Sequence, residues 1–101
     1  DLVDAVVIAT PTATHFDLAM KALGHDLHVF VEKPLAKTSA QCRKLVETAS
    51  ERNRVLFVGH VFLHSSPVQT LKNLVDSNEL GHINYISSRR LNLGPVRKDV
   101  S

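Results

Sequence analysis

The chain has 101 residues, of which 44% are hydrophobic and 22% charged, and its formal net charge is +2. A charge this small argues against nucleic acid or an anionic membrane surface as a partner, and no apolar run reaches the roughly 18 residues of a membrane span. The single cysteine, Cys42, excludes an internal disulfide and fits a reducing compartment, which favours the cytoplasm. Because the sequence opens and closes without the signals of a complete domain, we expect a piece of a longer protein.

Three short apolar runs are predicted to be strands: residues 5–9, 29–31 and 55–58. They are rich in β-branched residues and do not alternate with polar ones, which is typical of strands buried on both faces of a parallel sheet. Helical stretches lie between them, and the order strand, helix, strand, helix, strand predicts right-handed βαβ units. We therefore expect an α/β fold containing half of a doubly wound sheet.

The two connecting helices show an apolar face at helical spacing. That face is made of Phe16, Ala19, Met20 and Leu23 in the first helix, and of Cys42, Leu45, Val46 and Ala49 in the second. Thr14 with Asp17, and Thr38 with Gln41, are each spaced as a capping box, and Gly24 is a natural stop for the first helix. This placement makes Cys42 a core residue and not a nucleophile.

A third helix and a fourth strand are predicted after the sheet. Ser66 is the expected N-cap, Pro67 the first helical residue and Gln69 the third. The helix then carries an apolar face of Val68, Leu71 and Val75. Residues 82–93 resemble a strand, and the third parallel strand ends near Gly59, so we expect a boundary there that divides the chain into residues 1–60 and 61–101.

Polar and backbone-restricting residues follow each of the three predicted parallel strands, in segments 10–15, 32–34 and 59–60. Ligands of an open parallel sheet bind beyond the carboxyl ends of its strands, so these segments form the candidate site. For Thr10-Pro11-Thr12 the functional interpretation is a small, rigid platform that lets a flat ring lie against backbone and methyl groups, and the alternative is a plain turn. For His15 the alternative is a surface histidine near a helix start.

Lys33 is the most informative residue of these segments. It directly follows an apolar strand and directly precedes Pro34, which restricts Lys33 to extended backbone conformations. A fixed ammonium group at this place could hydrogen-bond a substrate hydroxyl and favour its deprotonation as a hydride leaves. The alternative is a surface lysine paired with Glu32, a pair worth only about 0–1 kcal/mol.

Two other patterns are rejected as sites. His60 and His64 are four residues apart, but no further ligands cluster nearby, so we predict no metal site. Arg89 and Arg90 would point to opposite faces of a strand and have no aromatic neighbours for stacking, so we predict no nucleic-acid partner.

Segments 4–15 and 28–36 resemble the Gfo/Idh/MocA family of oxidoreductases, whose name comes from glucose–fructose oxidoreductase and inositol dehydrogenase. The sequence Glu32-Lys33-Pro34, at this distance from Thr10-Pro11 and His15, is the most specific element of the resemblance. Residues 58–60, the Ser-Pro helix start and residues 77–83 are also similar to the family's passage into its second domain.

The resemblance implies a two-domain enzyme that uses NAD or NADP to oxidise or reduce a hydroxyl or carbonyl group of a sugar, nucleotide-sugar or cyclitol. Residues 1–60 would be the C-terminal half of its Rossmann domain. Residues 61–101 would be the crossover helix and the first strand of a C-terminal α+β substrate domain, whose large sheet would make the parent a homo-oligomer. Residues 84–93 resemble the members that act on nucleotide-linked sugars.

The resemblance also implies residue roles. The cofactor-binding residues would be Thr10, Pro11, Thr12, His15, Glu32, Lys33 and Pro34. Lys33 would also be the catalytic residue and contact the substrate, His60 would be a further substrate contact, and the peptide bond before Pro34 would be cis.

Some family features are missing from these residues: the glycine-rich phosphate loop, the residue that selects NAD or NADP, and the Asp-x-x-x-His pair that usually supplies the acid/base histidine. We therefore expect the chain alone to be inactive. Two other hypotheses stay open. One is a non-catalytic sugar-binding or regulatory relative, and the other is an assembly module that pairs its free sheet edge with another copy.

Overall fold

A computed structural model of the chain describes residues 3–89 and 91. The elements in chain order are β1 (Ala5–Ile8), η1 (Thr12–Thr14), α1 (His15–Gly24), β2 (His28–Val31), α2 (Ser39–Glu51), β3 (Leu56–Val58), η2 (Val61–His64) and α3 (Ser66–Asp76), where η marks a 3-10 helix. The chain divides after His60 into two compact units. The first unit contains the sheet, and the second contains η2 and α3.

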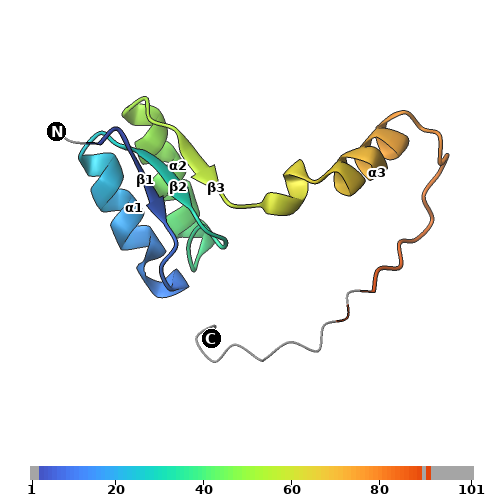
Figure 1. Ribbon diagram of the computed structural model, residues 1–101, viewed down its shortest axis with the longest axis horizontal. Coiled ribbons are helices and arrows are strands. Elements are labelled where there is room, and N and C mark those ends of the chain that lie inside the picture. Colours follow the sequence, from blue (N-terminus) through green and yellow to red (C-terminus); the bar gives the residue numbers. More distant parts are fainter. Residues whose placement is uncertain (1–2, 90, 92–101) are drawn as a thin grey trace. The chain divides into compact units, whose positions relative to one another are not determined.

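The first unit is built on a three-stranded parallel sheet in the order β1-β2-β3 (Figure 1). Val7 is paired with Phe30 and Phe30 with Phe57, so these residues form one row across the sheet. The predicted α/β fold with two βαβ units and parallel strands is confirmed. All three strands therefore end at the same edge.

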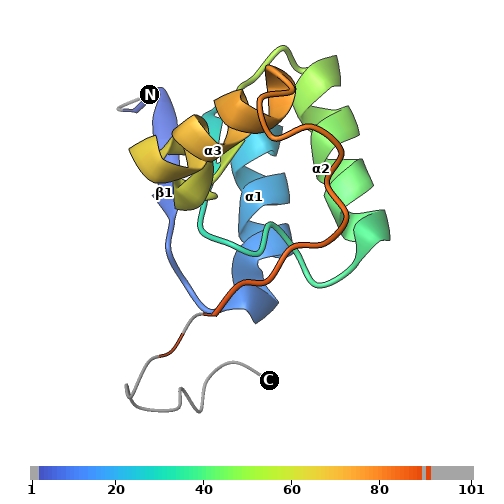
Figure 2. The ribbon, with the colours of Figure 1, turned by 90° about the vertical axis from the view of Figure 1, so that its right-hand side faces the viewer.

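Helices α1 and α2 lie side by side on one face of this sheet (Figure 2). Both connections run in the same direction across the sheet, and right-handed crossovers of that kind place their helices on the same face. The core lies between the helices and the sheet. It is made of Ile8, Ala19, Ala22, Leu23, Val29, Val31, Ala36, Leu45 and Ala49, with half-buried Phe16, Met20 and Cys42 packed against it.

Among the described residues of the first unit, no helix covers the other face of the sheet, which corrects the expectation of strands buried on both faces. Val7 is 74% exposed, and Phe57 is exposed beside a half-buried Phe30. The two phenylalanine rings stack with centroids 5.5 Å apart and planes inclined by 18°. The apolar runs are continuous because the second face is apolar as well, but both described helices of this unit cover the first.

The predicted helix ends are partly correct. Thr38 caps α2 as expected, with its hydroxyl oxygen accepting a hydrogen bond from Gln41 N at 3.2 Å. Thr14 does not cap α1, because η1 runs directly into that helix and leaves Thr14 in a helical conformation and not in the extended one that an N-cap needs. The predicted apolar face of α2 is wrong at Val46, which is 56% exposed.

The second unit consists of η2, α3 and the residues that follow. The N-cap of α3 is Ser65 and not Ser66, so the helix begins one residue earlier than predicted, with the proline still in its first turn. The predicted strand 82–93 is not formed at residues 82–89 and 91, and no described strand hydrogen-bonds to this segment; its other residues lie outside the described part of the chain. A strand without a pairing partner leaves its backbone groups unsatisfied, which explains the difference. Within the described residues, no helix is long and apolar enough to cross a membrane.

Candidate functional site

The candidate site lies at the carboxyl edge of the sheet, which we define as the residues that follow β1, β2 and β3: 9–15, 32–34 and 59–60. The backbone holds these three segments together just past the strand ends. Glu32 N donates to Ile8 O at 2.9 Å, and Gly59 N donates to Val31 O at 2.8 Å. The segments that sequence analysis singled out are therefore neighbours across the sheet.

Lys33 leaves β2 at this edge with its side chain in solvent. Its backbone N–H donates to Glu32 Oε2 at 3.2 Å, and the Lys33–Pro34 peptide bond is cis, as expected. The ammonium group forms no hydrogen bond or ion pair with any of residues 3–89 or 91. The ion pair with Glu32 that would make Lys33 an ordinary surface lysine is thus not formed, and Nζ is available to a ligand.

Glu32 and Gly59 connect the second and third segments of the edge. The half-buried Glu32 carboxyl group lies over the Cα of the buried Gly59, where a Cβ would stand 3.2 Å from Oε1 and 3.3 Å from Oε2. The absence of a side chain at residue 59 therefore leaves room for the carboxylate that accepts from Lys33 N. In the sequence, Gly59 is recognisable only as the end of a strand, and no spacing pattern indicates its contact with Glu32.

The first segment is ordered by its own hydroxyl groups. Thr14 Oγ1 donates to Pro11 O at 2.9 Å and lies 2.7 Å from Thr10 Oγ1. A hydroxyl has one proton to donate, so Thr10 donates to Thr14. Thr10 and Pro11 are exposed and Thr12 is half-buried. Thr10 and Pro11 therefore offer a small exposed surface of backbone and side chain, with Thr12 partly covered beside them.

His15 occupies a place that neither sequence interpretation expected. It is 1% exposed, and its ring lies between two backbone carbonyls, with Nε2 2.8 Å from Thr10 O and Nδ1 2.8 Å from Pro34 O. It is therefore not a surface histidine, and neither ring nitrogen is left for a bound dinucleotide. His15 ties the first segment of the edge to the second.

The remaining candidates are more peripheral. His60 ends the first unit, with its side chain exposed and its backbone N–H donating to Val58 O at 2.7 Å. Among the residues described, no group of three or more His, Cys, Asp or Glu side chains is arranged to hold a metal ion. Cys42 is half-buried and packs against the core, in agreement with the structural role predicted for it.

Known proteins that are similar to this chain belong to one oxidoreductase family. Residues 1–60 match the model of the oxidoreductase family GFO_IDH_MocA, described as an NAD-binding Rossmann fold. The chain is 34% identical over 96 residues to the inositol 2-dehydrogenase of Salmonella typhimurium, covering 93% of this chain and 28% of that protein. It thus spans little more than a quarter of that curated relative.

Solved structures give the same result. An inositol dehydrogenase homologue from Azotobacter vinelandii, complexed with NADH and myo-inositol, is 35% identical with a TM-score of 0.75, covering 78% of this chain and 21% of that one. A 3-ketoreductase from Actinomadura kijaniata, in complex with TDP-benzene and NADP, is 32% identical with a TM-score of 0.71, covering 77% and 25%. With the parallel sheet and the Glu32-Lys33-Pro34 edge, these matches show that the chain belongs to the Gfo/Idh/MocA family of oxidoreductases.

Proposed function

We propose that the complete protein is an NAD(P)-dependent oxidoreductase that transfers a hydride between the nicotinamide and a hydroxyl or carbonyl carbon of a sugar, nucleotide-sugar or cyclitol. The observation that carries this proposal is the ammonium group of Lys33, which has no partner among residues 3–89 and 91 and stands at the carboxyl edge of a parallel sheet. Ligands of such sheets bind at this edge. The relatives that bind NADH with myo-inositol, or NADP with a TDP compound, support the chemical class.

In this proposal β1, β2 and β3 are the second half of the Rossmann sheet. Their consecutive order, with both helices on one face, agrees with a half-sheet that continues beyond β1. The residues that would approach the cofactor are Thr10, Pro11, Thr12, Glu32, Lys33 and Pro34. His15 would support the backbone of these residues and would not contact the cofactor, because its ring is buried.

The residues present fit the nicotinamide end of a dinucleotide. The edge offers a small exposed surface at Thr10 and Pro11, a carboxylate at Glu32 and, at Lys33, an exposed ammonium group that no described residue binds. When bound, the nicotinamide supplies the hydride acceptor or donor. The phosphate-binding loop would come from residues outside this sequence, so this edge alone would bind a dinucleotide weakly.

Lys33 would act on the oxygen of the reacting carbon. Its ammonium group would donate a hydrogen bond to that oxygen and so stabilise the negative charge that develops there as the hydroxyl proton leaves. Glu32 would help to hold the lysine in place, because its carboxylate fixes the Lys33 backbone N–H. The proton itself would pass to an acid/base group that these residues do not include.

The first test measures binding of NADH and of NADPH to the complete protein. The readout is the quenching or enhancement of nicotinamide fluorescence. Turnover is then measured with myo-inositol and with dTDP-glucose as probes of the cyclitol and nucleotide-sugar classes. We expect micromolar binding of at least one cofactor and reduction of NAD+ or NADP+ with at least one probe. Failure of both cofactors to bind would overturn the proposal.

Lys33→Ala tests the assigned role directly. Loss of a hydrogen bond that stabilises charge in the transition state should lower kcat by about 100-fold or more while the cofactor Kd changes little. Lys33→Arg retains the charge but not the compact ammonium group, so we expect partial activity. Normal turnover in Lys33→Ala would remove the lysine from the mechanism.

A further inference from the structure

The position of His15 allows an inference about how the reactive lysine is held, and this inference rests on the proposed function. We propose that His15 is a positioning residue whose ring, protonated on both nitrogens, donates to Thr10 O and Pro34 O and so fixes the backbone on which Lys33 stands. The ring is 1% exposed and lies 2.8 Å from each carbonyl oxygen.

The chemistry of the two partners sets the proton count. A backbone carbonyl oxygen only accepts hydrogen bonds, and a neutral imidazole has one N–H to donate. With a neutral ring, one nitrogen lone pair would face a carbonyl lone pair at 2.8 Å in a buried place, which leaves both groups unsatisfied. The doubly protonated ring satisfies both carbonyls with charge-assisted bonds.

The two carbonyls belong to different segments of the carboxyl edge. Thr10 follows β1. Pro34 follows β2 and is joined to Lys33 by the cis peptide bond. Glu32 Oε2 holds the amide on the N-terminal side of Lys33, and the His15 ring holds the carbonyl on the C-terminal side of Pro34. The lysine backbone is thus fixed at both ends, while its side chain has no partner among the described residues.

His28 provides an internal reference for the proton count. Its Nδ1 accepts a hydrogen bond from Val55 N at 2.9 Å, so that nitrogen carries no proton. The hydrogen bonds of the two histidines therefore predict opposite states of Nδ1 within one chain: protonated in His15 and without a proton in His28. A spectrum that distinguishes protonated from bare ring nitrogens can read both at once.

The first experiment records ring ¹⁵N–¹H correlation spectra of the complete protein labelled at histidine, with His15→Phe and His28→Phe used to assign the signals. We expect two N–H signals from His15 and a bare Nδ1 from His28. A bare nitrogen in His15 would overturn the doubly protonated ring. This readout needs neither cofactor nor substrate, so it stands apart from any failure of the proposed function.

The second experiment measures amide hydrogen exchange in His15→Phe, with His25→Phe as the matched control. His25 lies just past the other end of α1, and its ring is exposed. We expect exchange at the amides of Lys33, Leu35 and Ala36 to rise by about tenfold in His15→Phe, as follows from loss of one anchoring hydrogen bond, with β2 itself unchanged. Equal changes in both variants, or a rise spread over the whole sheet, would show a merely structural role.

The third experiment asks whether His15 acts through Lys33. His15→Phe should lower kcat by about tenfold with little change in the KM for substrate, because a misplaced ammonium group stabilises the transition state less well. In a Lys33→Ala background the same change should lower kcat by less than about twofold, since residues that act as a unit are not additive. Additive losses would overturn the coupling, whereas an inactive wild-type protein would refute the proposed function and leave the spectroscopic result in force.

Discussion

The Glu32 carboxyl group occupies the space that a side chain on Gly59 would need. A Cβ at residue 59 would stand 3.2 Å from Oε1 and 3.3 Å from Cδ, closer than ordinary van der Waals contact. The same carboxylate accepts from Lys33 N, so the glycine after β3 and the lysine after β2 are linked through one group.

Gly59→Ala is therefore expected to disturb the site more than the fold. The carboxyl group is the end of a flexible side chain and can shift by a few tenths of an ångström, so the free energy of unfolding should fall by only about 1 kcal/mol. The shift weakens the bond to Lys33 N, and kcat in the complete protein should fall by several-fold.

The control for this prediction is the same substitution without the carboxyl group. In a Glu32→Ala background, Gly59→Ala should cost almost no stability, because the close contact is gone. Denaturant titrations of the four variants give the coupling. A full-size loss in the double variant would show that Gly59 is needed for its backbone and not for the space beside Glu32.

Gly24→Ala is expected to have the opposite effect on stability. Gly24 is the last residue of α1, and a Cβ there would meet nothing within 4 Å. Alanine is more favourable than glycine in a helix by up to about 1 kcal/mol, because it loses less backbone entropy on folding. Thermal unfolding should therefore shift upward, and a downward shift would mean that the helix end needs a conformation only glycine adopts.

The features that the sequence predicted correctly are those that depend on residues close together in the chain. The apolar run 5–9, the face containing Ala19 and Leu23, and the cap at Thr38 each follow from local spacing. The parallel order of the strands follows from the alternation of strands and helices along the chain. That order brings the segments after the strands to one edge of the sheet. The position of Lys33 at that edge was predicted in this way, from a strand before it and a proline after it.

The features that the sequence missed depend on distant partners or on backbone atoms. His15 binds a carbonyl 19 residues away, and every residue has a carbonyl, so no side-chain pattern marks that contact. Thr14 has the spacing of a capping box, but η1 sets its backbone in a helical conformation. Exposure of Val7 depends on which face the helices cover, which an apolar run does not specify.

Leu45→Ala should destabilise the first unit strongly. The side chain is 0% exposed in the core between α2 and the sheet. Removal of a buried leucine side chain costs about 2–5 kcal/mol through lost burial and the remaining cavity. The matched control is Val46→Ala on the same helix, where a 56% exposed side chain should change stability by less than about 0.5 kcal/mol. Equal effects of the two variants in denaturant would contradict the helix orientation.

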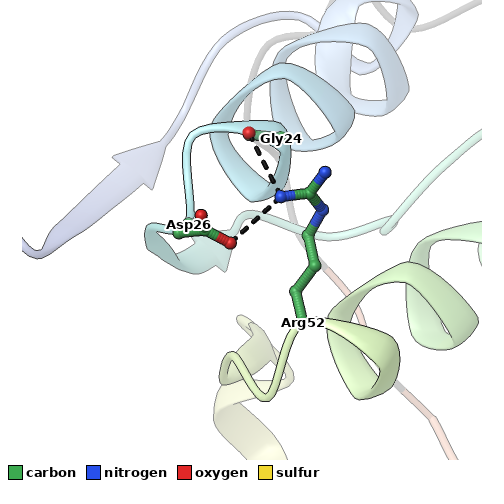
Figure 3. A network of polar contacts seen from close by, with 3 residues as sticks. All are labelled: Gly24, Asp26 and Arg52. Atoms are coloured by element: carbon green, nitrogen blue, oxygen red, sulfur yellow. Dashed lines mark hydrogen bonds and ion pairs between the residues drawn. The ribbon is translucent and has the colours of Figure 1, made fainter.

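At the opposite end of the strands, Arg52 links the end of α2 to the turn after α1 (Figure 3). Its Nη1 donates to Asp26 Oδ1 at 3.0 Å and to Gly24 O at 3.3 Å, and both side chains of the ion pair are exposed. An exposed ion pair is worth about 0–1 kcal/mol and is screened by salt. Arg52→Ala should therefore cost less than about 1 kcal/mol at low salt, and less again in 1 M salt.

Asp26 should be more sensitive to backbone than to charge. Its φ of 57° lies in the left-handed region, which aspartate and asparagine tolerate and β-branched residues do not. Asp26→Asn loses only the ion pair and should resemble Arg52→Ala, whereas Asp26→Val should cost a further 1–3 kcal/mol or so because of backbone strain. Denaturant titrations of the three variants at low and high salt separate the two effects. If Asp26→Val proved no worse than Asp26→Asn, the turn would have to adopt a different backbone from the one described.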